Sequence, residues 1–316
     1  MSKAICTTTI YPPSKALLRF IEIAAEDDWH IYVAGDQKTP HDLYIELEKK
    51  HAFFHYITPT DQTAMDDHLS EAIGWNCIQR RNFAFLAAHK WLNADVVASV
   101  DDDNIPYEGW GRNLLVGQRC KVIGVRTEGA AFDPMTRTNH NRLWHRGFPI
   151  QLLAQREVPN LNDVYMTPDV QADFWDGDPD VDAICRMEHG PKDLIFTPSF
   201  FPFTSDKPAP FNSQNTFLTK EVLPHYCMLP HVGRADDIWP AYHVQAQGFK
   251  VVFGKPSVVQ ERNAQDVMKN FRDEQLNYMH NLDIVHAVNA GDKEPLKPFL
   301  PERAALAFHL YQRHFK

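Results

Sequence analysis

Short apolar, β-branched runs alternate with stretches of helical periodicity along the first 125 residues. The pattern predicts strands over 4–10, 29–34 and 53–57, and a helix over 15–25 whose apolar positions recur every three to four residues. Strand, helix and strand in this order are typical of a parallel sheet with helices on its faces. Ligands bind such sheets beyond the carboxyl ends of the strands.

One predicted strand is continuous with a group of carboxylates. Residues 96–100 are apolar or small, as expected of a strand buried on both faces, and Asp101, Asp102 and Asp103 follow directly. Charged carboxylates are not stable in a dry core, so these residues must lie at the strand's exit. Asp101 and Asp103 point the same way in an extended chain and can share a divalent cation, although an acidic turn is the simpler alternative.

The pattern changes in the second half of the chain. A helix is expected from Arg81, a strand over 121–125, and another strand over 249–253. Between them, residues 126–219 read as a long irregular insertion, which in a compact domain is usually functional. Residues 266–288 and 302–314 are expected to be helical and to form a carboxyl-terminal extension.

Composition and charge narrow the class of protein. The chain has 316 residues, is 44% hydrophobic, and carries a net charge of −9, which argues against nucleic acid as its main partner. Five cysteines without a C-x-x-C pair suggest reduced thiols and a cytoplasmic protein. No signal peptide or membrane-spanning run is apparent, so we expect no membrane span.

Other polar residues lie where such a fold binds ligands. Thr7, Thr8 and Asp36 follow predicted strands and are candidates for reading a nucleoside, or else ordinary turn and strand residues. Arg80 and Arg81 precede a helix, where a cation is unfavourable unless an anion is bound. A solvated arginine pair is the alternative.

The later candidates are amides, aromatic residues and a second acidic pair. Asn212 lies in an amide-rich segment, and Trp175 and Trp239 provide aromatic surface, a combination suited to sugars or to a buried turn network. Asp236 and Asp237 open a predicted helix, where acids are favourable for stability alone. Either acid can also orient or deprotonate an acceptor hydroxyl.

Seven segments, taken together and in this order, resemble the STELLO family and, more distantly, the reversibly glycosylated polypeptides that act as UDP-arabinopyranose mutases. The segments cover residues 35–40, 80–82, 100–104, 146–149, 178–183, 211–215 and 234–239.

The resemblance implies a GT-A-like nucleotide-sugar-binding fold, with a mostly parallel central sheet flanked by helices. It implies a catalytic domain over 1–265, with a nucleotide half to about 125 and an acceptor half after it, followed by the helical extension 266–316. It further implies a UDP-sugar donor, and Mn²⁺ or Mg²⁺ held at Asp101 to Asp103. Thr7, Lys38 and Asp102 belong to the same predicted nucleotide-sugar site.

The chain departs from these families at some positions. Asn104 stands where the mutases have a cysteine, and the histidine that many GT-A enzymes use as a further metal ligand has no clear match. Glu261 and Asn263 are the nearest candidates, and Glu261 is the predicted third metal ligand.

We therefore expect a metal-dependent glycosyltransferase that acts on a glycan-type acceptor, with Asp237 or Asp236 as the base. A homo-oligomer is compatible with the sequence. Two alternatives stay open. A UDP-sugar mutase would interconvert pyranose and furanose rings without an acceptor, and a non-catalytic scaffold would keep the fold without turnover.

Overall fold

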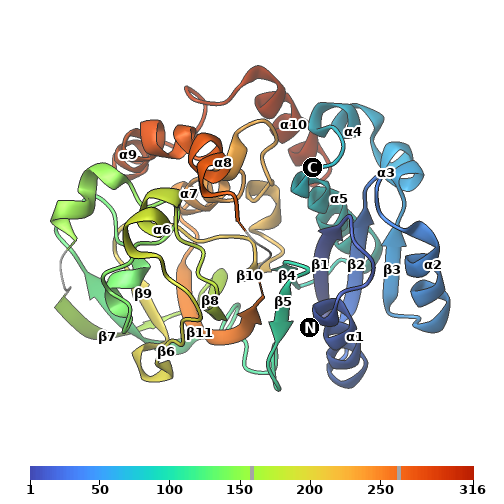
Figure 1. The fold of residues 1–316 in the computed structure, drawn as a ribbon, viewed down its shortest axis with the longest axis horizontal. Helices are drawn as coiled ribbons and strands as arrows, with labels where there is room; N and C mark the ends of the chain where they lie inside the picture. The colour runs from blue at the N-terminus through green and yellow to red at the C-terminus, as the bar shows by residue number, and fades with distance from the viewer. Residues whose placement is uncertain (157–159, 262–264) are drawn as a thin grey trace.

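The protein is described by a computed structural model that covers residues 1–156, 160–261 and 265–316. Its strands form one mixed sheet in the order β3-β2-β1-β4-β10-β8-β11-β9-β6-β7, and β5 pairs with β11 (Figure 1). Helices flank the sheet, so the predicted α/β class is confirmed. The strand bounds are β1 Lys3–Thr9, β2 His30–Gly35, β3 Phe54–Ile57, β4 Val96–Val100, β5 Asn104–Pro106, β6 Cys120–Arg126, β7 Asn160–Met166, β8 Val170–Gly177, β9 Phe203–Ser205, β10 Asn215–Thr219 and β11 Val251–Gln260.

The amino-terminal part of the sheet is parallel. β1 lies between β2 and β4, and β3 pairs with β2, all in parallel register. Each residue of β4 is buried, in agreement with its apolar sequence. The carboxyl ends of β1 and β4 therefore meet at the same edge, which brings Thr8 and Thr9 close to the acidic triplet.

The other part of the sheet mixes parallel and antiparallel pairs. β10 is antiparallel to both β4 and β8, whereas β8 and β11 are parallel. The prediction of an irregular insertion over 126–219 is thus wrong in part, because this segment contributes β7, β8, β9 and β10. Strands β8 and β10 were not predicted because their buried positions include the polar residues Gln171 and Asn215, which break the apolar pattern. Strand β7 has no buried position that would produce such a pattern.

Helices cover the sheet, and some of them begin at side-chain caps. Ser14 caps α1, and Thr58 with Asp61 forms a capping box at α3. Helix α5 packs against β1 and β2. The α-helix bounds are α1 Lys15–Asp27, α2 His41–Lys50, α3 Pro59–Met65, α4 Asp67–Ile73, α5 Arg81–Ala87, α6 Ala183–His189, α7 Ile238–Ala246, α8 Val267–Asp273, α9 Gln275–Asn289 and α10 Glu302–Arg313.

The carboxyl-terminal helices return to the body of the molecule. Helix α9 packs on α7, and α10 packs on α4, beside the amino-terminal strands (Figure 1). His314 contacts Asp66, the cap of α4, at 2.8 Å. The helices predicted after residue 265 are confirmed. Through α7 and α4 they contact helices that cover different parts of the sheet. No helix within the described ranges is both long and apolar enough to cross a membrane.

Candidate functional site

Two adjoining cavities lie at the edge of the sheet where β1 and β4 end. We call them the Asp102 cavity, of about 290 Å³, and the Asp236 cavity, of about 340 Å³. Cys77, Ile78 and Asp101 line both. The Asp102 cavity is also lined by Thr8, Thr9, Ile10, Tyr11, Asn76, Arg81, Asp102 and Asp103. The Asp236 cavity is also lined by Gln79, Arg146, Asp180, Ser213, Gln214, Met228, Gly233, Arg234, Asp236, Asp237, Lys269 and Asp273.

The acidic triplet lies at the exit of β4, as predicted, and all three of its residues line the Asp102 cavity. Asp102 accepts a short hydrogen bond from the Thr9 hydroxyl, which ties the ends of β4 and β1 together. Burial and the neighbouring Asp101 charge raise the pKa of Asp102 above its usual value. A bound cation would relieve this crowding of carboxylates.

Arg81 links the acidic triplet to Ser99 in strand β4. Its guanidinium is buried and lies 2.5 Å from a carboxylate oxygen of Asp101, whose side chain stays 22% exposed. The same group donates to the hydroxyls of Ser99 and Ser213 at 3.1 Å. Arg81 therefore fixes the position of Asp101 between the two cavities.

Asp236 is the acid whose charge is least compensated in its own cavity. It is 8% exposed and accepts a hydrogen bond of 2.7 Å from the Gln79 side-chain amide. Burial and the adjacent Asp237 charge raise the pKa of Asp236 to about 7. A carboxyl group that titrates near neutral pH can exchange a proton with a ligand.

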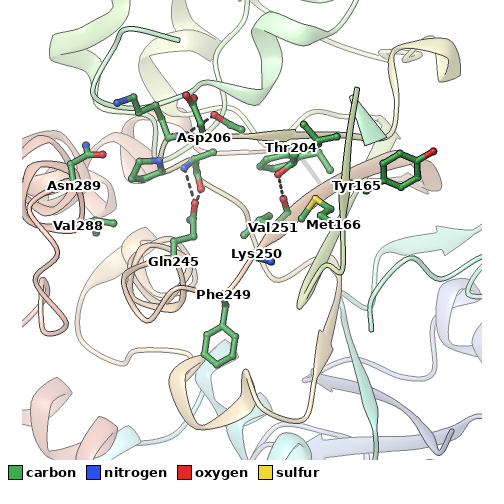
Figure 2. A pocket seen from close by; sticks show the side chains of 16 residues that line it. Tyr165, Met166, Thr204, Asp206, Gln245, Phe249, Lys250, Val251, Val288 and Asn289 are labelled. Carbon is green, nitrogen blue, oxygen red and sulfur yellow. Dashed lines mark hydrogen bonds between the residues drawn. The ribbon is translucent and has the colours of Figure 1, made fainter. Parts of the chain in front are cut away.

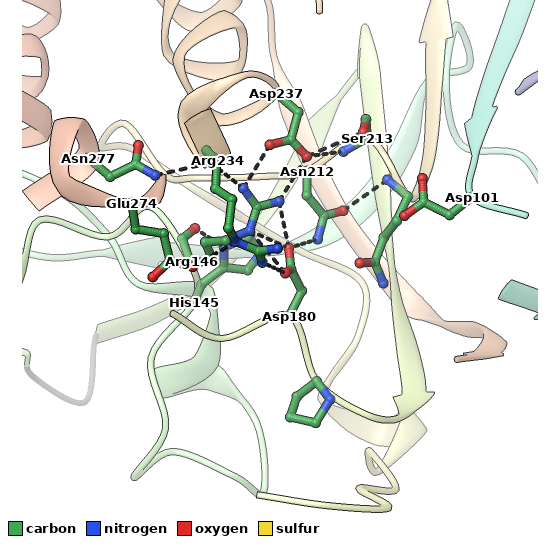
Figure 3. A network of polar contacts seen from close by, with 12 residues as sticks. Asp101, His145, Arg146, Asp180, Asn212, Ser213, Arg234, Asp237, Glu274 and Asn277 are labelled. Atoms are coloured by element: carbon green, nitrogen blue, oxygen red, sulfur yellow. Dashed lines mark hydrogen bonds and ion pairs between the residues drawn. The ribbon is translucent and has the colours of Figure 1, made fainter. Parts of the chain in front are cut away.

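Asp237 is held in a buried ion-pair network instead (Figure 3). Arg146 donates to both of its oxygens, at 2.9 and 3.0 Å, and the Ser213 backbone amide adds a third bond of 3.0 Å. Burial disfavours its charge, but Arg146 outweighs burial and lowers the pKa of Asp237. Asp237 is therefore suited to a positioning role.

The network extends from Arg146 to α8 and α9. Arg146 also binds Asp180 at 2.9 Å, and Arg234 joins Asp180 at 3.2 Å to Glu274 at 2.8 Å. Figure 3 shows Arg146 and Arg234 side by side above Asp180. The sequence did not single out Arg146, Asp180 or Gln79 as site residues, because their partners are far away along the chain.

The structure brings some predicted nucleoside-binding residues to the Asp102 cavity and leaves others outside its lining. Thr8 lines the cavity, and its hydroxyl donates to the Ala34 carbonyl at 2.7 Å. Thr7 is buried beside it, and Lys38 is exposed elsewhere. Asp36 is 1% exposed and accepts from the backbone amides of Asn76 and Cys77, at 2.9 and 3.0 Å. It thereby positions two residues of the cavity wall.

Arg80 and Trp239 lie outside both linings. The Arg80 side chain bonds to Gln62 at 2.8 Å and to Ser70, and its guanidinium stacks 3.6 Å from the Trp75 ring. Burial lowers the pKa of Arg80 to about 10. Trp239 is fully buried and donates to Asn281 at 2.9 Å. Both residues have structural partners that account for their positions.

The remaining predicted residues also lie outside both linings. Asn212 is buried and donates to Asp180 at 2.9 Å, and Trp175 is buried against Phe174. Glu261 is exposed, and its backbone amide donates to the Asp103 carbonyl at 3.2 Å, so it follows the strand that lies beside the triplet. Asn263 lies outside the described residues. Within the described ranges, no group of three or more His, Cys, Asp or Glu is arranged to hold a metal ion.

A larger cavity, of about 540 Å³, lies apart from these residues (Figure 2). Its wall comes from β7, β9, the start of β11, and the ends of α7 and α9, including Tyr165, Gln245 and Lys250. It contains none of the residues predicted for the site.

Comparisons with known proteins give structural likeness only. No protein-family model and no curated protein sequence matches the chain. The chain is similar to the M. tuberculosis glucosyl-3-phosphoglycerate synthase, with a TM-score of 0.45 and 12% identity over 89% of this chain and 79% of that one. It is similar to a mannosyltransferase from Pyrobaculum calidifontis, solved with GDP-Man and Mn²⁺, with a TM-score of 0.42 and 13% identity over 98% of this chain and 70% of that one. The predicted resemblance to the STELLO family stays a prediction.

Proposed function

We propose that the protein is a metal-dependent glycosyltransferase of GT-A type that transfers a sugar from a nucleotide-sugar donor, a UDP-sugar, to a hydroxyl of a glycan-type acceptor. The observation that carries the proposal is the pair of cavities joined at Asp101. One cavity gathers three carboxylates at the ends of β1 and β4, and the other presents Asp236, whose pKa of about 7 suits a proton acceptor.

The Asp102 cavity would hold the nucleotide end of the donor. Thr8 and Thr9 from β1 and the backbone of Asn76 and Cys77 form its walls, and Asp36 fixes that backbone from behind. Parallel sheets bind nucleotides at this edge. Arg81 lies at the boundary with the Asp236 cavity, where a diphosphate would lie.

Carboxylate oxygens of the acidic triplet would be the protein ligands of a divalent cation, although no three-residue ligand set is arranged for one within the described ranges. Three carboxylates line the Asp102 cavity, and the buried Asp102 has a raised pKa, so charge there is under-compensated. Mn²⁺ or Mg²⁺ prefers oxygen ligands and takes its remaining ligands from phosphates and water. Asp101 and Asp103 would hold the ion, with Glu261 as a further candidate. When bound, the ion would neutralise the diphosphate leaving group.

The Asp236 cavity would hold the transferred sugar and the acceptor. Asp236 would accept the proton of the attacking hydroxyl, and Gln79 would orient its carboxylate. Asp237 would remain ion-paired to Arg146 and keep the start of α7 in place. Asn212 would contribute through Asp180 rather than by touching the sugar.

Calorimetry with a panel of nucleoside diphosphates tests the donor site. We expect UDP to bind in the presence of Mn²⁺ and not in its absence, and Asp103→Asn to weaken binding at least tenfold. Asp163→Asn is a matched control, because it removes one exposed carboxylate from β7, far along the chain from the triplet. Folded protein that binds no nucleotide under either condition would overturn the proposal.

Product analysis then separates the reaction types. Incubation with a UDP-sugar should yield UDP together with transferred or hydrolysed sugar. A change of ring form with the nucleotide still attached would identify a mutase. Nucleotide binding without any conversion would leave a scaffold role.

A further inference from the structure

A further cavity, of about 490 Å³, is lined by residues of β8, β10 and β11 and of the loop that follows β5. We call it the Asp173 cavity. Among the described residues, it shares no lining residue with the two cavities of the proposed site. The core side chains Trp110, Phe196, Phe201 and Phe217 form part of its wall. Pockets for small organic molecules commonly have this size and an apolar wall with a few polar groups, so the cavity can hold such a molecule.

Asp173 on β8 places a buried carboxyl group in the wall of this cavity, where the residue is 8% exposed. Its Oδ1 accepts a hydrogen bond of 2.9 Å from the Gln171 side-chain amide, and its Oδ2 accepts one of 2.7 Å from the Ser257 hydroxyl. Because both oxygens accept, the arrangement suits a charged carboxylate rather than a carboxylic acid, which would donate from one oxygen. Both partners are neutral, and Asp173 has no ion pair among the described residues. The exposed Lys255 acts on it only at longer range.

The two donors to Asp173 are themselves held in place. Gln171 uses its carbonyl oxygen to accept from the Leu115 backbone amide at 2.6 Å, which leaves its amino group for Asp173. The Ser257 hydroxyl accepts from the Asn215 side-chain amide at 2.9 Å, which leaves its proton for Asp173. A buried charge whose fixed partners are all neutral is poorly compensated, and a cation from outside the chain would compensate it.

We propose that the Asp173 cavity binds a small organic cation, a molecule that carries a protonated amine on an apolar group. The ammonium would pair with the Asp173 carboxylate, and the apolar group would pack against Phe196 and Phe201. Aromatic rings in the wall also attract cations. A hydrated metal ion fits less well beside aromatic side chains, and no set of three metal-ligating residues is arranged here within the described ranges. The proposal is independent of the proposed function.

Ligand-observed NMR titration at pH 7.5 tests the proposal without nucleotide or sugar. The probes are isobutylamine, cyclohexylmethylamine and phenethylamine, and each is compared with the alcohol of the same carbon skeleton. We expect at least one amine to bind about tenfold more tightly than its alcohol, because a hydrogen bond to a buried charge is stronger than one between neutral groups. If no amine binds more tightly than its alcohol, the proposal is overturned.

Two variants place the amine at Asp173. Asp173→Asn keeps the shape of the side chain and should reduce the preference for the amine to less than about twofold. Asp176→Asn is the matched control, because Asp176 lines the same cavity but is bonded to the Tyr107 hydroxyl at 2.9 Å and to the Phe196 backbone amide at 2.8 Å. It should leave the preference above about fivefold. A preference that survives Asp173→Asn would overturn the proposal.

A pH titration of the wild type gives the same answer if Asp173→Asn does not fold. Burial raises the pKa of Asp173 to about 6, so lowering the pH from 7.5 to 5 should weaken amine binding about tenfold and leave alcohol binding unchanged. The other ionisable residues of the lining are Tyr107, Glu108, Asp176 and Lys255. The same loss in Asp176→Asn would support Asp173 as the titrating group. Amine binding that does not weaken, or weakens only when Asp176 is present, would overturn the proposal.

Discussion

Arg146 donates to both carboxylate oxygens of Asp237, at 2.9 and 3.0 Å, while Asp236 next to it bonds to the neutral Gln79. Two adjacent acids therefore have opposite environments. Their pKa values move apart, with that of Asp237 lowered and that of Asp236 raised to about 7. Such a division separates an acid that holds structure from one that can exchange a proton.

Replacing Asp236 should remove the proposed base. Asp236→Asn keeps the size of the side chain, so we expect transfer to fall by about 100-fold or more while the nucleotide Kd stays within twofold. Steady-state kinetics and calorimetry measure the two effects. Asp66→Asn, at the cap of α4, is a control acid outside both cavities and should leave both values unchanged.

The pH dependence of transfer follows from the same residue. Because a base must be deprotonated and the pKa of Asp236 is about 7, kcat should rise as pH increases through about 7. Loss of the Gln79 hydrogen bond disfavours the charged form, so Gln79→Ala should move this limb to higher pH. A limb that is unchanged in Gln79→Ala would argue against Asp236 as the titrating group.

The contribution of Asp236 to folding stability should fall as pH rises, whereas kcat should increase. Its pKa in the folded protein is raised, so its contribution is fully present below its unfolded value and is lost as pH rises toward about 7. Asp236→Asn removes this loss, and its melting temperature should decline less between pH 4 and pH 8 than that of the wild type. Thermal unfolding across this range measures the difference.

Breaking the Arg146 network should destabilise the fold. Arg146→Ala leaves Asp237 buried without its cation and takes one cation away from Asp180, and we expect the free energy of unfolding to fall by about 3–5 kcal/mol. Arg112→Ala is the matched control, because it removes an arginine that pairs with Glu26 and Asp27 on the surface. It should change stability little, as exposed pairs do. Urea unfolding compares the two variants.

Replacing Arg80 or Arg81 by lysine should have different effects on nucleotide affinity and on stability. Arg81→Lys loses the contacts that hold Asp101, so nucleotide affinity in Mn²⁺ should fall about tenfold. Arg80→Lys loses buried bonds to Gln62 and Ser70, so it should cost about 2 kcal/mol of stability and leave nucleotide affinity within twofold. Equal loss of affinity in both variants would contradict this assignment.

The sequence predicted the parts of the fold that depend on local pattern. The sequence of strand β4 is apolar on both faces and is followed by acidic residues. In the structure the strand is buried and the acidic residues line a cavity at its end. Strands β8 and β10 escaped prediction because Gln171 and Asn215 are polar. Their partners, the Leu115 amide and Trp110, are 56 and 105 residues away, and no local pattern shows that such groups are paired.

The candidate site could likewise be predicted only in part from the sequence. The acidic triplet and the pair Asp236 and Asp237 follow from their positions at a strand exit and a helix start, but the sequence does not separate the two acids of the pair. The roles of Arg80 and Arg81 could not be separated, because one faces α4 and the other faces β4 only after the chain has folded. Arg146 is 34 residues from Asp180 and 91 residues from Asp237, so its part in the site is a property of the tertiary structure.

Helix α8 contributes Lys269 and Asp273 to the wall of the Asp236 cavity, although it follows the predicted domain boundary at residue 265. The residues of the Asp102 cavity, in contrast, all come from the first 103 positions. The Asp236 cavity therefore combines residues 77–79 and 101 with residues 146–273, whereas the Asp102 cavity needs only the first part of the chain. A chimera that exchanges residues 267–273 would change the wall of the Asp236 cavity and keep the lining residues of the Asp102 cavity.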